Sequence, residues 1–150
     1  MLTYEKGDLI TNKGYTIFCH QVNCRYRMGS GIAKQIRSLY PEVYREYMSL
    51  NRQTLGTIQP VITNDCRVCI NMFAQDNYGR DGKRYTDYTA FKNCLNEIEK
   101  YLKSNRDDMV VAFPYGIGCG LGGGDWHVIK GMLMDFSSKI KQPVKIVSLR

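Results

Sequence analysis

Hydrophobic and polar residues along the chain form blocks that predict several buried strands. Short apolar runs rich in β-branched residues are typical of strands that pack in a core. A polar Asn64-Asp65 pair between two of these runs is typical of a tight turn. The predicted strands are Thr16–Val22, Thr57–Thr63, Arg67–Phe73, Met109–Phe113 and Val144–Leu149.

Other segments repeat apolar residues at every third or fourth position, which is the spacing of an amphipathic helix. The clearest repeat covers Tyr88–Leu102, with Thr86 or Asp87 as the N-cap residue. Two shorter segments should turn Leu39 and Met48 toward the core together with their other apolar residues. The predicted helices are Gly31–Tyr40, Glu42–Leu50, Tyr88–Leu102 and Trp126–Ile140.

The order of these elements predicts the fold class. Strands that alternate with helices build an α/β layered sheet, in which the helices cross over between strands. The chain has 150 residues, the size of one domain, and it contains no linker-like segment or internal repeat. We therefore expect a single α/β domain over residues 1–150.

Composition narrows the class of protein. Hydrophobic residues make up 43% of the chain, and no apolar run reaches the length that spans a membrane. The N-terminal segment carries charges where a signal peptide needs an apolar stretch. We therefore expect a cytoplasmic protein without a membrane partner.

Charge and cysteine content bear on ligands. Lys and Arg exceed Asp and Glu by 21 to 14, and the resulting formal charge of +7 favours anionic partners such as nucleic acid or phosphorylated small molecules. Among the six cysteines only Cys66 and Cys69 form a close pair, and no second pair or nearby histidine completes a zinc-type pattern. We expect free thiols, no metal and no cofactor.

Two glycine-rich segments each run from a predicted strand into a predicted helix. They are Asn23–Ala33 and Tyr115–Trp126, and the second contains six glycines. Glycine lets backbone N–H groups converge on a phosphate, and a helix N-terminus favours negative charge. Neither segment fits a Walker A or a complete Rossmann pattern. Side by side, the two loops predict a site for two linked phosphates, with tight turns as the alternative explanation of the glycines.

Four motifs resemble, in order, those of the macrodomain family, whose members bind ADP-ribose and in many cases hydrolyse its derivatives. The motifs are Gly7–Leu9, His20–Asn23, Met28–Ala33 and Tyr115–Trp126. The resemblance covers essentially the whole chain and implies a three-layer α-β-α sandwich with a mixed central sheet. The form with His20 and Gly118–Leu121 is most similar to the branch that contains ADP-ribose 1''-phosphate phosphatases and terminal ADP-ribose protein glycohydrolases.

The resemblance implies roles for residues in these motifs. Asp8 would accept a hydrogen bond from the adenine amino group, and Asn23 would bond the distal ribose. The implied catalytic residues are His20, Asn23 and Asp125, with His20 as acid or base and Asp125 orienting a water. The implied ligand-binding residues are Asp8, Leu9, Asn23, Gly29, Ser30, Gly31, Ile32, Gly118, Cys119, Gly120, Leu121 and Gly122.

The same polar side chains also have structural explanations. Asp8 and Asn23 are typical turn residues, and a histidine in an apolar run, such as His20, is more often a core residue. Asp125 is a good N-cap for the helix that follows it. Sequence alone leaves these alternatives open.

Three classes of function follow from the resemblance and the charge: an enzyme, an ADP-ribose reader and a nucleic-acid binder. The preferred hypothesis is dephosphorylation of ADP-ribose 1''-phosphate, and removal of ADP-ribose from a macromolecule is the second enzymatic option. Against a lysine-adduct glycohydrolase, the strand Asn71–Gln75 contains no lysine, and Gly122 stands where that branch carries an aspartate. The same pocket could instead read ADP-ribose without chemistry. Nucleic acid, suggested by the basic segment that includes Lys83 and Arg84, is a less favoured partner, and we expect a monomer.

Overall fold

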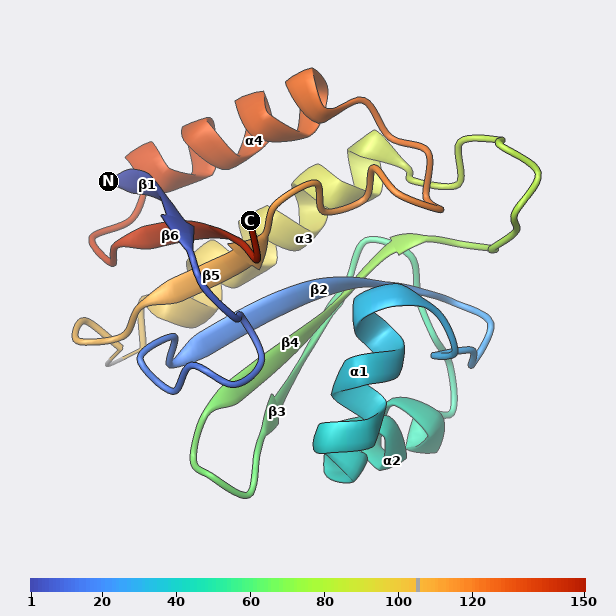
Figure 1. The fold of residues 1–150 in the computed structure, drawn as a ribbon, viewed down its shortest axis with the longest axis horizontal. Coiled ribbons are helices and arrows are strands. Elements are labelled where there is room, and N and C mark those ends of the chain that lie inside the picture. The colour runs from blue at the N-terminus through green and yellow to red at the C-terminus, as the bar shows by residue number, and fades with distance from the viewer. Residues whose placement is uncertain (105) are drawn as a thin grey trace.

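The computed structural model describes residues 1–104 and 106–150, and this part of the chain has the predicted α/β architecture (Figure 1). Its strands are β1 (Leu2–Lys6), β2 (Ile17–Asn23), β3 (Ile58–Ile62), β4 (Val68–Gln75), β5 (Val111–Pro114) and β6 (Val144–Ser148). Its helices are α1 (Gly31–Leu39), α2 (Pro41–Ser49), α3 (Tyr88–Leu102) and α4 (Trp126–Ser138). None of these helices has the length and apolar character that crossing a membrane requires.

The strands form one mixed sheet in the order β1-β6-β5-β2-β4-β3. All neighbouring strands are parallel except β3 and β4. In the described chain, β2 and β5 pair only through Ile17 with Val111 and Phe18 with Ala112. Beyond these pairs β2 continues along β4, while β5 continues along β6. The sheet therefore opens between β2 and β5 at the edge where both glycine-rich loops leave it.

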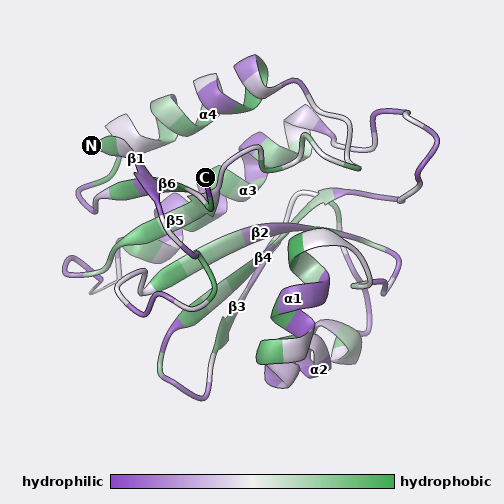
Figure 2. Cartoon of the chain, in the orientation of Figure 1, coloured by the Kyte–Doolittle hydropathy of each residue, from purple (hydrophilic) through white to green (hydrophobic). Residues whose placement is uncertain are grey.

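Helices cover both faces of the sheet, which confirms the three-layer sandwich. Helices α3 and α4 pack on one face through residues such as Phe91 and Ile129, and α1 and α2 pack on the other through Ile36, Val43 and Tyr47 (Figure 1). Figure 2 shows β4 and β5 as mainly hydrophobic and the edge strand β1 as mainly hydrophilic. Because α1 follows β2 on one face and α4 follows β5 on the other, the two loops diverge, and such switch points are where α/β sheets bind ligands.

The helices differ in how their first turns are capped. Asp87 accepts a hydrogen bond from the Ala90 N–H at 2.9 Å, which settles the N-cap of α3 in its favour. Asp125 caps α4 in the same way, accepting from the His127 N–H at 2.8 Å. Helix α1 begins after Ser30, whose side chain makes no capping hydrogen bond, and its first turn has no acidic residue. The N–H groups at the start of α1 are therefore left to another acceptor.

The structure corrects three expectations. Strand β1 was not predicted, because an edge strand with one partner alternates polar and apolar residues too briefly for a recognisable pattern. Leu39 and Met48 are 54% and 40% exposed rather than buried. The buried residues here are spaced four positions apart, Ile36 with Tyr40 and Val43 with Tyr47. Leu39 and Met48 each lie one position away from this row and are turned toward solvent.

A buried arginine anchors the segment between β1 and β2. Arg67 is 2% exposed and donates hydrogen bonds to the carbonyl oxygens of Leu9, Ile10 and Tyr15. It also donates to the Tyr40 hydroxyl at 2.9 Å, and its guanidinium lies over the Phe18 ring. One side chain thus satisfies three backbone carbonyls that no strand or helix satisfies.

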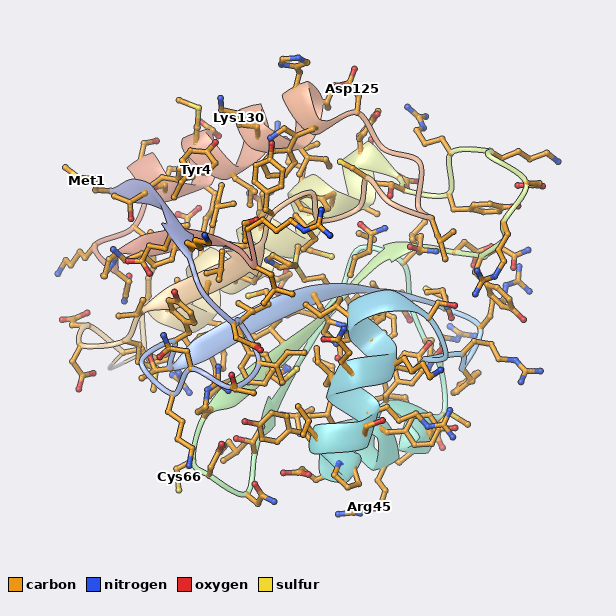
Figure 3. All side chains as sticks on the ribbon, viewed as in Figure 1. Met1, Tyr4, Arg45, Cys66, Asp125 and Lys130 are labelled. Atoms are coloured by element: carbon orange, nitrogen blue, oxygen red, sulfur yellow. The ribbon has the colours of Figure 1, made fainter. Side chains whose placement is uncertain are left out.

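We expect Arg67→Met to lower the free energy of unfolding by about 3 kcal/mol, because it leaves buried carbonyl groups without donors. Chemical denaturation measures this change. The matched control is Arg45→Met, since Arg45 is exposed on α2 (Figure 3) and makes no hydrogen bond within the described chain. Equal stability of the two variants would contradict the anchoring role.

Candidate functional site

A cavity of about 770 Å³ opens at the carboxyl edge of the sheet, between β2 and β5. Most of its lining comes from three segments: residues 26–33 after β2, residues 114–118 and 120–122 at the end of β5 and after it, and residues 78–80 after β4. The first two are the glycine-rich loops that the sequence singles out. The structure therefore brings the two predicted phosphate loops to one cavity.

The first loop is held in place by the amide of Asn23. Its Oδ1 accepts hydrogen bonds from the Arg25 N–H at 2.9 Å and from the Tyr47 hydroxyl at 2.8 Å, and its Nδ2 donates to the Arg27 carbonyl. Burial raises the pKa of Tyr47 to about 12, so its hydroxyl keeps the donated proton at neutral pH. Asn23 is 8% exposed and lines the cavity, but its amide groups already have protein partners.

The first loop presents unpaired backbone donors to the cavity. Within the described chain, the N–H groups of residues 29–32 make no hydrogen bond to a protein acceptor. All four residues line the cavity, and they are Gly29, Ser30, Gly31 and Ile32. Unsatisfied N–H groups at the start of a helix form an anion site.

The second loop presents donors in the same way. The Gly118 carbonyl oxygen is turned into the protein, where it accepts from the Thr86 hydroxyl at 2.6 Å and from the Gly124 N–H at 2.8 Å. No protein acceptor in the described chain receives the N–H groups of four cavity-lining residues, which are Gly118, Gly120, Leu121 and Gly122. The loop therefore faces the cavity with hydrogen-bond donors, while the Gly118 carbonyl oxygen points away from it. This arrangement suits an anion.

Two glycines of the second loop are required by close packing. A Cβ on Gly122 would lie 2.6 Å from the Thr86 hydroxyl oxygen and 2.8 Å from the Gly118 carbonyl oxygen. Gly118 has a φ of +76°, and its Cβ would lie 2.9 Å from Oε1 of Gln21. The bare backbone is needed because the loop lies directly on these side chains.

The charged side chains that line the cavity are all arginines, namely Arg27, Arg37 and Arg80. Arg80 reaches across to the first loop, where its Nη2 donates to the Ser30 hydroxyl at 3.2 Å. Among the described residues, the lining contains no aspartate, glutamate, histidine or lysine. The described chain also lacks any cluster of three His, Cys, Asp or Glu side chains that could hold a metal. The cavity is therefore cationic.

His20 lies outside the cavity. It is fully buried in β2, and its Nε2 lies 2.5 Å from Oδ1 of Asn71, whose Nδ2 donates to Gln59. Burial lowers the pKa of His20 to about 4, so the ring is neutral at pH 7. This is the position of a core residue and gives no support to direct contact between His20 and a ligand.

Four other predicted residues are also absent from the lining of the cavity. Asp125 is exposed at the start of α4 (Figure 3), where it serves as the N-cap. The Asp8 carboxylate accepts from the N–H groups of Ile10 and Thr11 and so stabilises the turn after β1. Leu9 is buried beside this turn. Cys119 does not line the cavity either, and partial burial raises the pKa of its thiol.

Several lining residues are not marked by the sequence as part of a phosphate site. Tyr78 and Arg80 belong to the basic, aromatic segment Tyr78–Arg84, which suggests nucleic acid as a partner, and Gln21 lies in a motif whose expected functional positions are its ends. They line the same cavity only because β2, β4 and β5 are neighbours in the sheet. A search for arginines beside glycine-rich motifs would have found Arg27 but not Arg80.

Comparisons with known proteins agree with this geometry. The family profile described as Macro domain matches residues 19–132, a stretch that includes both glycine-rich loops. An Enterobacteria phage T4 protein, described as an uncharacterized 17.5 kDa protein in the tk-vs intergenic region, is 26% identical, with 94% of this chain and 93% of that protein covered.

Solved structures share the fold. The macrodomain of Mycobacterium tuberculosis DarG superposes with a TM-score of 0.83 at 23% identity, covering 98% of this chain and 96% of that chain. Thermosipho africanus DarTG in complex with ADP-ribose superposes with a TM-score of 0.81 at 19% identity, covering 97% of this chain and 41% of that chain. At these identities the likeness concerns the fold.

The burial of His20 predicts a dependence of stability on pH. The unfolded chain binds a proton at this histidine near pH 6.5, whereas the folded chain does not until about pH 4, so acid favours the unfolded state. We expect His20 to remove about 2 kcal/mol from the free energy of unfolding between pH 7 and pH 5.

Denaturation at both pH values measures this effect as the difference between the wild type and His20→Gln. The control is His127→Gln, because His127 is exposed on α4 and should leave the fall with pH unchanged. A His20→Gln variant that loses as much stability as the wild type would overturn the prediction.

Proposed function

The chain belongs to the macrodomain family, and from that membership we propose that its cavity binds ADP-ribose or a derivative of it. The observation that carries the proposal is the pair of loops whose unpaired N–H groups face one cavity. A diphosphate needs two adjoining sets of donors, and each loop supplies one. The complex of Thermosipho africanus DarTG with ADP-ribose supports the choice of ligand.

The residues proposed to bind the diphosphate are the lining members of the predicted set. Gly29–Ile32 would hold one phosphate, and Gly118 with Gly120–Gly122 would hold the other and approach the distal ribose. Asp8 and Leu9 remain proposed contacts for adenine, although the Asp8 carboxylate is engaged in its own turn. The proposal therefore depends on the diphosphate site rather than on adenine recognition.

Dephosphorylation of ADP-ribose 1''-phosphate is the second proposal, and the cationic lining favours it. A terminal phosphate carries more charge than the diphosphate bridge, and Arg27 and Arg80 add guanidinium donors to the lining of the cavity. Rate enhancement would come from positioning and electrostatic stabilisation by N–H groups and arginines. His20 and Asp125 lie outside the cavity, so neither is given a role in this reaction.

Hydrolysis of an ADP-ribosyl bond through a lysine adduct is less well supported. The end of β4 carries Gln75, whose amide bonds to Gln21 and to the Asn77 carbonyl, and no lysine lines the cavity in the described chain. An amide cannot form the adduct that a lysine amine forms.

Gly122→Ala tests the binding site, because the added methyl group must displace Thr86 or the Gly118 carbonyl. We expect the dissociation constant for ADP-ribose to rise about tenfold or more by titration calorimetry. The matched control is Gly131→Ala in α4, where a Cβ meets open space. Failure of the wild type to bind ADP-ribose, or equal affinities of both variants, would contradict the proposal.

A phosphorus NMR time course with ADP-ribose 1''-phosphate at neutral pH tests the reaction. We expect an inorganic phosphate signal to grow beside intact ADP-ribose at a rate proportional to protein concentration. Broadened substrate signals without phosphate release would leave binding as the function. They would reject the phosphatase proposal without affecting the first.

A further inference from the structure

A chain of partly buried hydrogen bonds supports the second glycine-rich loop on its side away from the cavity. Nε2 of Gln21 donates to Oε1 of Gln75 at 2.7 Å and to the Thr86 hydroxyl oxygen at 2.8 Å. The Thr86 hydroxyl in turn donates to the Gly118 carbonyl oxygen at 2.6 Å. The chain joins β2, the end of β4, the segment before α3 and the loop after β5.

Each bond in this chain runs in a determined direction. The Thr86 hydroxyl has one proton, and the Gly118 carbonyl can only accept, so the hydroxyl must accept from Gln21. Both Nε2 protons of the Gln21 amide are then engaged, and a flip that exchanged its Oε1 and Nε2 would lose both bonds. Its Oε1 is consequently buried without a partner in the described chain.

The unpaired oxygen indicates that this orientation is maintained at a cost. A buried acceptor without a donor destabilises a fold by about 1–3 kcal/mol. The orientation that leaves Oε1 unpaired is the one that directs a donor through Thr86 to Gly118. Thr86 is only 2% exposed, so water does not replace its hydroxyl at the carbonyl.

The direction of the Gly118 carbonyl decides whether the loop can accept an anion. Thr86 and the Gly124 N–H together hold this oxygen in the protein, and the loop faces the cavity with the N–H groups of Gly118 and residues 120–122. A carbonyl oxygen turned toward the cavity would repel a phosphate instead. A loop this rich in glycine has little intrinsic preference between such orientations, so an external constraint has to choose.

We propose that Thr86, oriented by Gln21, is a positioning residue that fixes the Gly118 carbonyl away from the cavity and so prepares the second loop for the phosphate that it binds. This inference rests on the proposed diphosphate site. Thr86 does not line the cavity and touches no ligand in this arrangement. Its effect passes through the peptide of Gly118.

Thr86→Val removes the hydroxyl and keeps the shape of the side chain. We expect it to raise the dissociation constant for ADP-ribose about tenfold and to change that for AMP, which has one phosphate, by less than about twofold. Thr86→Ser keeps the hydroxyl and should restore the affinity for ADP-ribose. Titration calorimetry on the full chain measures all three affinities.

Thr16→Val is the matched control for loss of a partly buried threonine hydrogen bond. The Thr16 hydroxyl donates a hydrogen bond to the Val110 carbonyl oxygen and accepts one from the Val110 N–H. These bonds lie at the opposite end of β2 from the cavity. The substitution should lower the free energy of unfolding about as much as Thr86→Val, by about 1 kcal/mol, and leave both affinities unchanged.

The outcomes separate this inference from the proposed function. A wild type that does not bind ADP-ribose contradicts both. A wild type that binds while Thr86→Val binds equally well overturns the positioning role alone. If Thr86→Val lost affinity for ADP-ribose and AMP equally, or if Thr16→Val lost as much affinity for ADP-ribose as Thr86→Val, the effect would be a general structural one. Either result would also reject the inference.

Discussion

The short pairing between β2 and β5 is the constraint on which the rest of the molecule depends. Two residue pairs, Ile17 with Val111 and Phe18 with Ala112, bind the halves of the sheet together before the strands separate. A longer pairing would close the carboxyl edge, and no pairing would let the two glycine-rich loops drift apart. The cavity exists because the strands meet and then diverge, with successive helices on opposite faces.

Backbone hydrogen bonding distinguishes the parts that hold the fold from the part that meets a ligand. Helices α3 and α4 are capped by their own aspartates, and Arg67 satisfies carbonyl groups in the segment after β1. Helix α1 and the second loop leave N–H groups unpaired at the cavity. These unpaired N–H groups lie together at the cavity, where the guanidinium groups of Arg27 and Arg80 also line the wall.

Features that depend on local sequence patterns could be predicted from the sequence. Features that depend on contacts between residues distant in the sequence could not. Apolar periodicity located α3 with its bounds, and glycine-rich motifs located both loops. The placement of His20 and Asp125 required the fold, because a histidine in an apolar strand and an aspartate before a helix suit catalysis and structure equally well. The bonds among Gln21, Gln75 and Thr86 join residues separated by up to 65 positions, so no local pattern announces them.

The position of β6 in the sheet has a consequence for how the chain reaches this structure. The strand that is last in the sequence lies between β1 and β5, and Lys145 within it contacts Glu5 and Thr3 at the other end of the chain. During synthesis, β1 therefore has no partner and β5 keeps an open apolar edge until β6 has left the ribosome. Such unpaired edges invite aggregation, and contacts this distant in sequence form slowly. The sheet, and with it the protection of these edges, is complete only when β6 takes its place between β1 and β5.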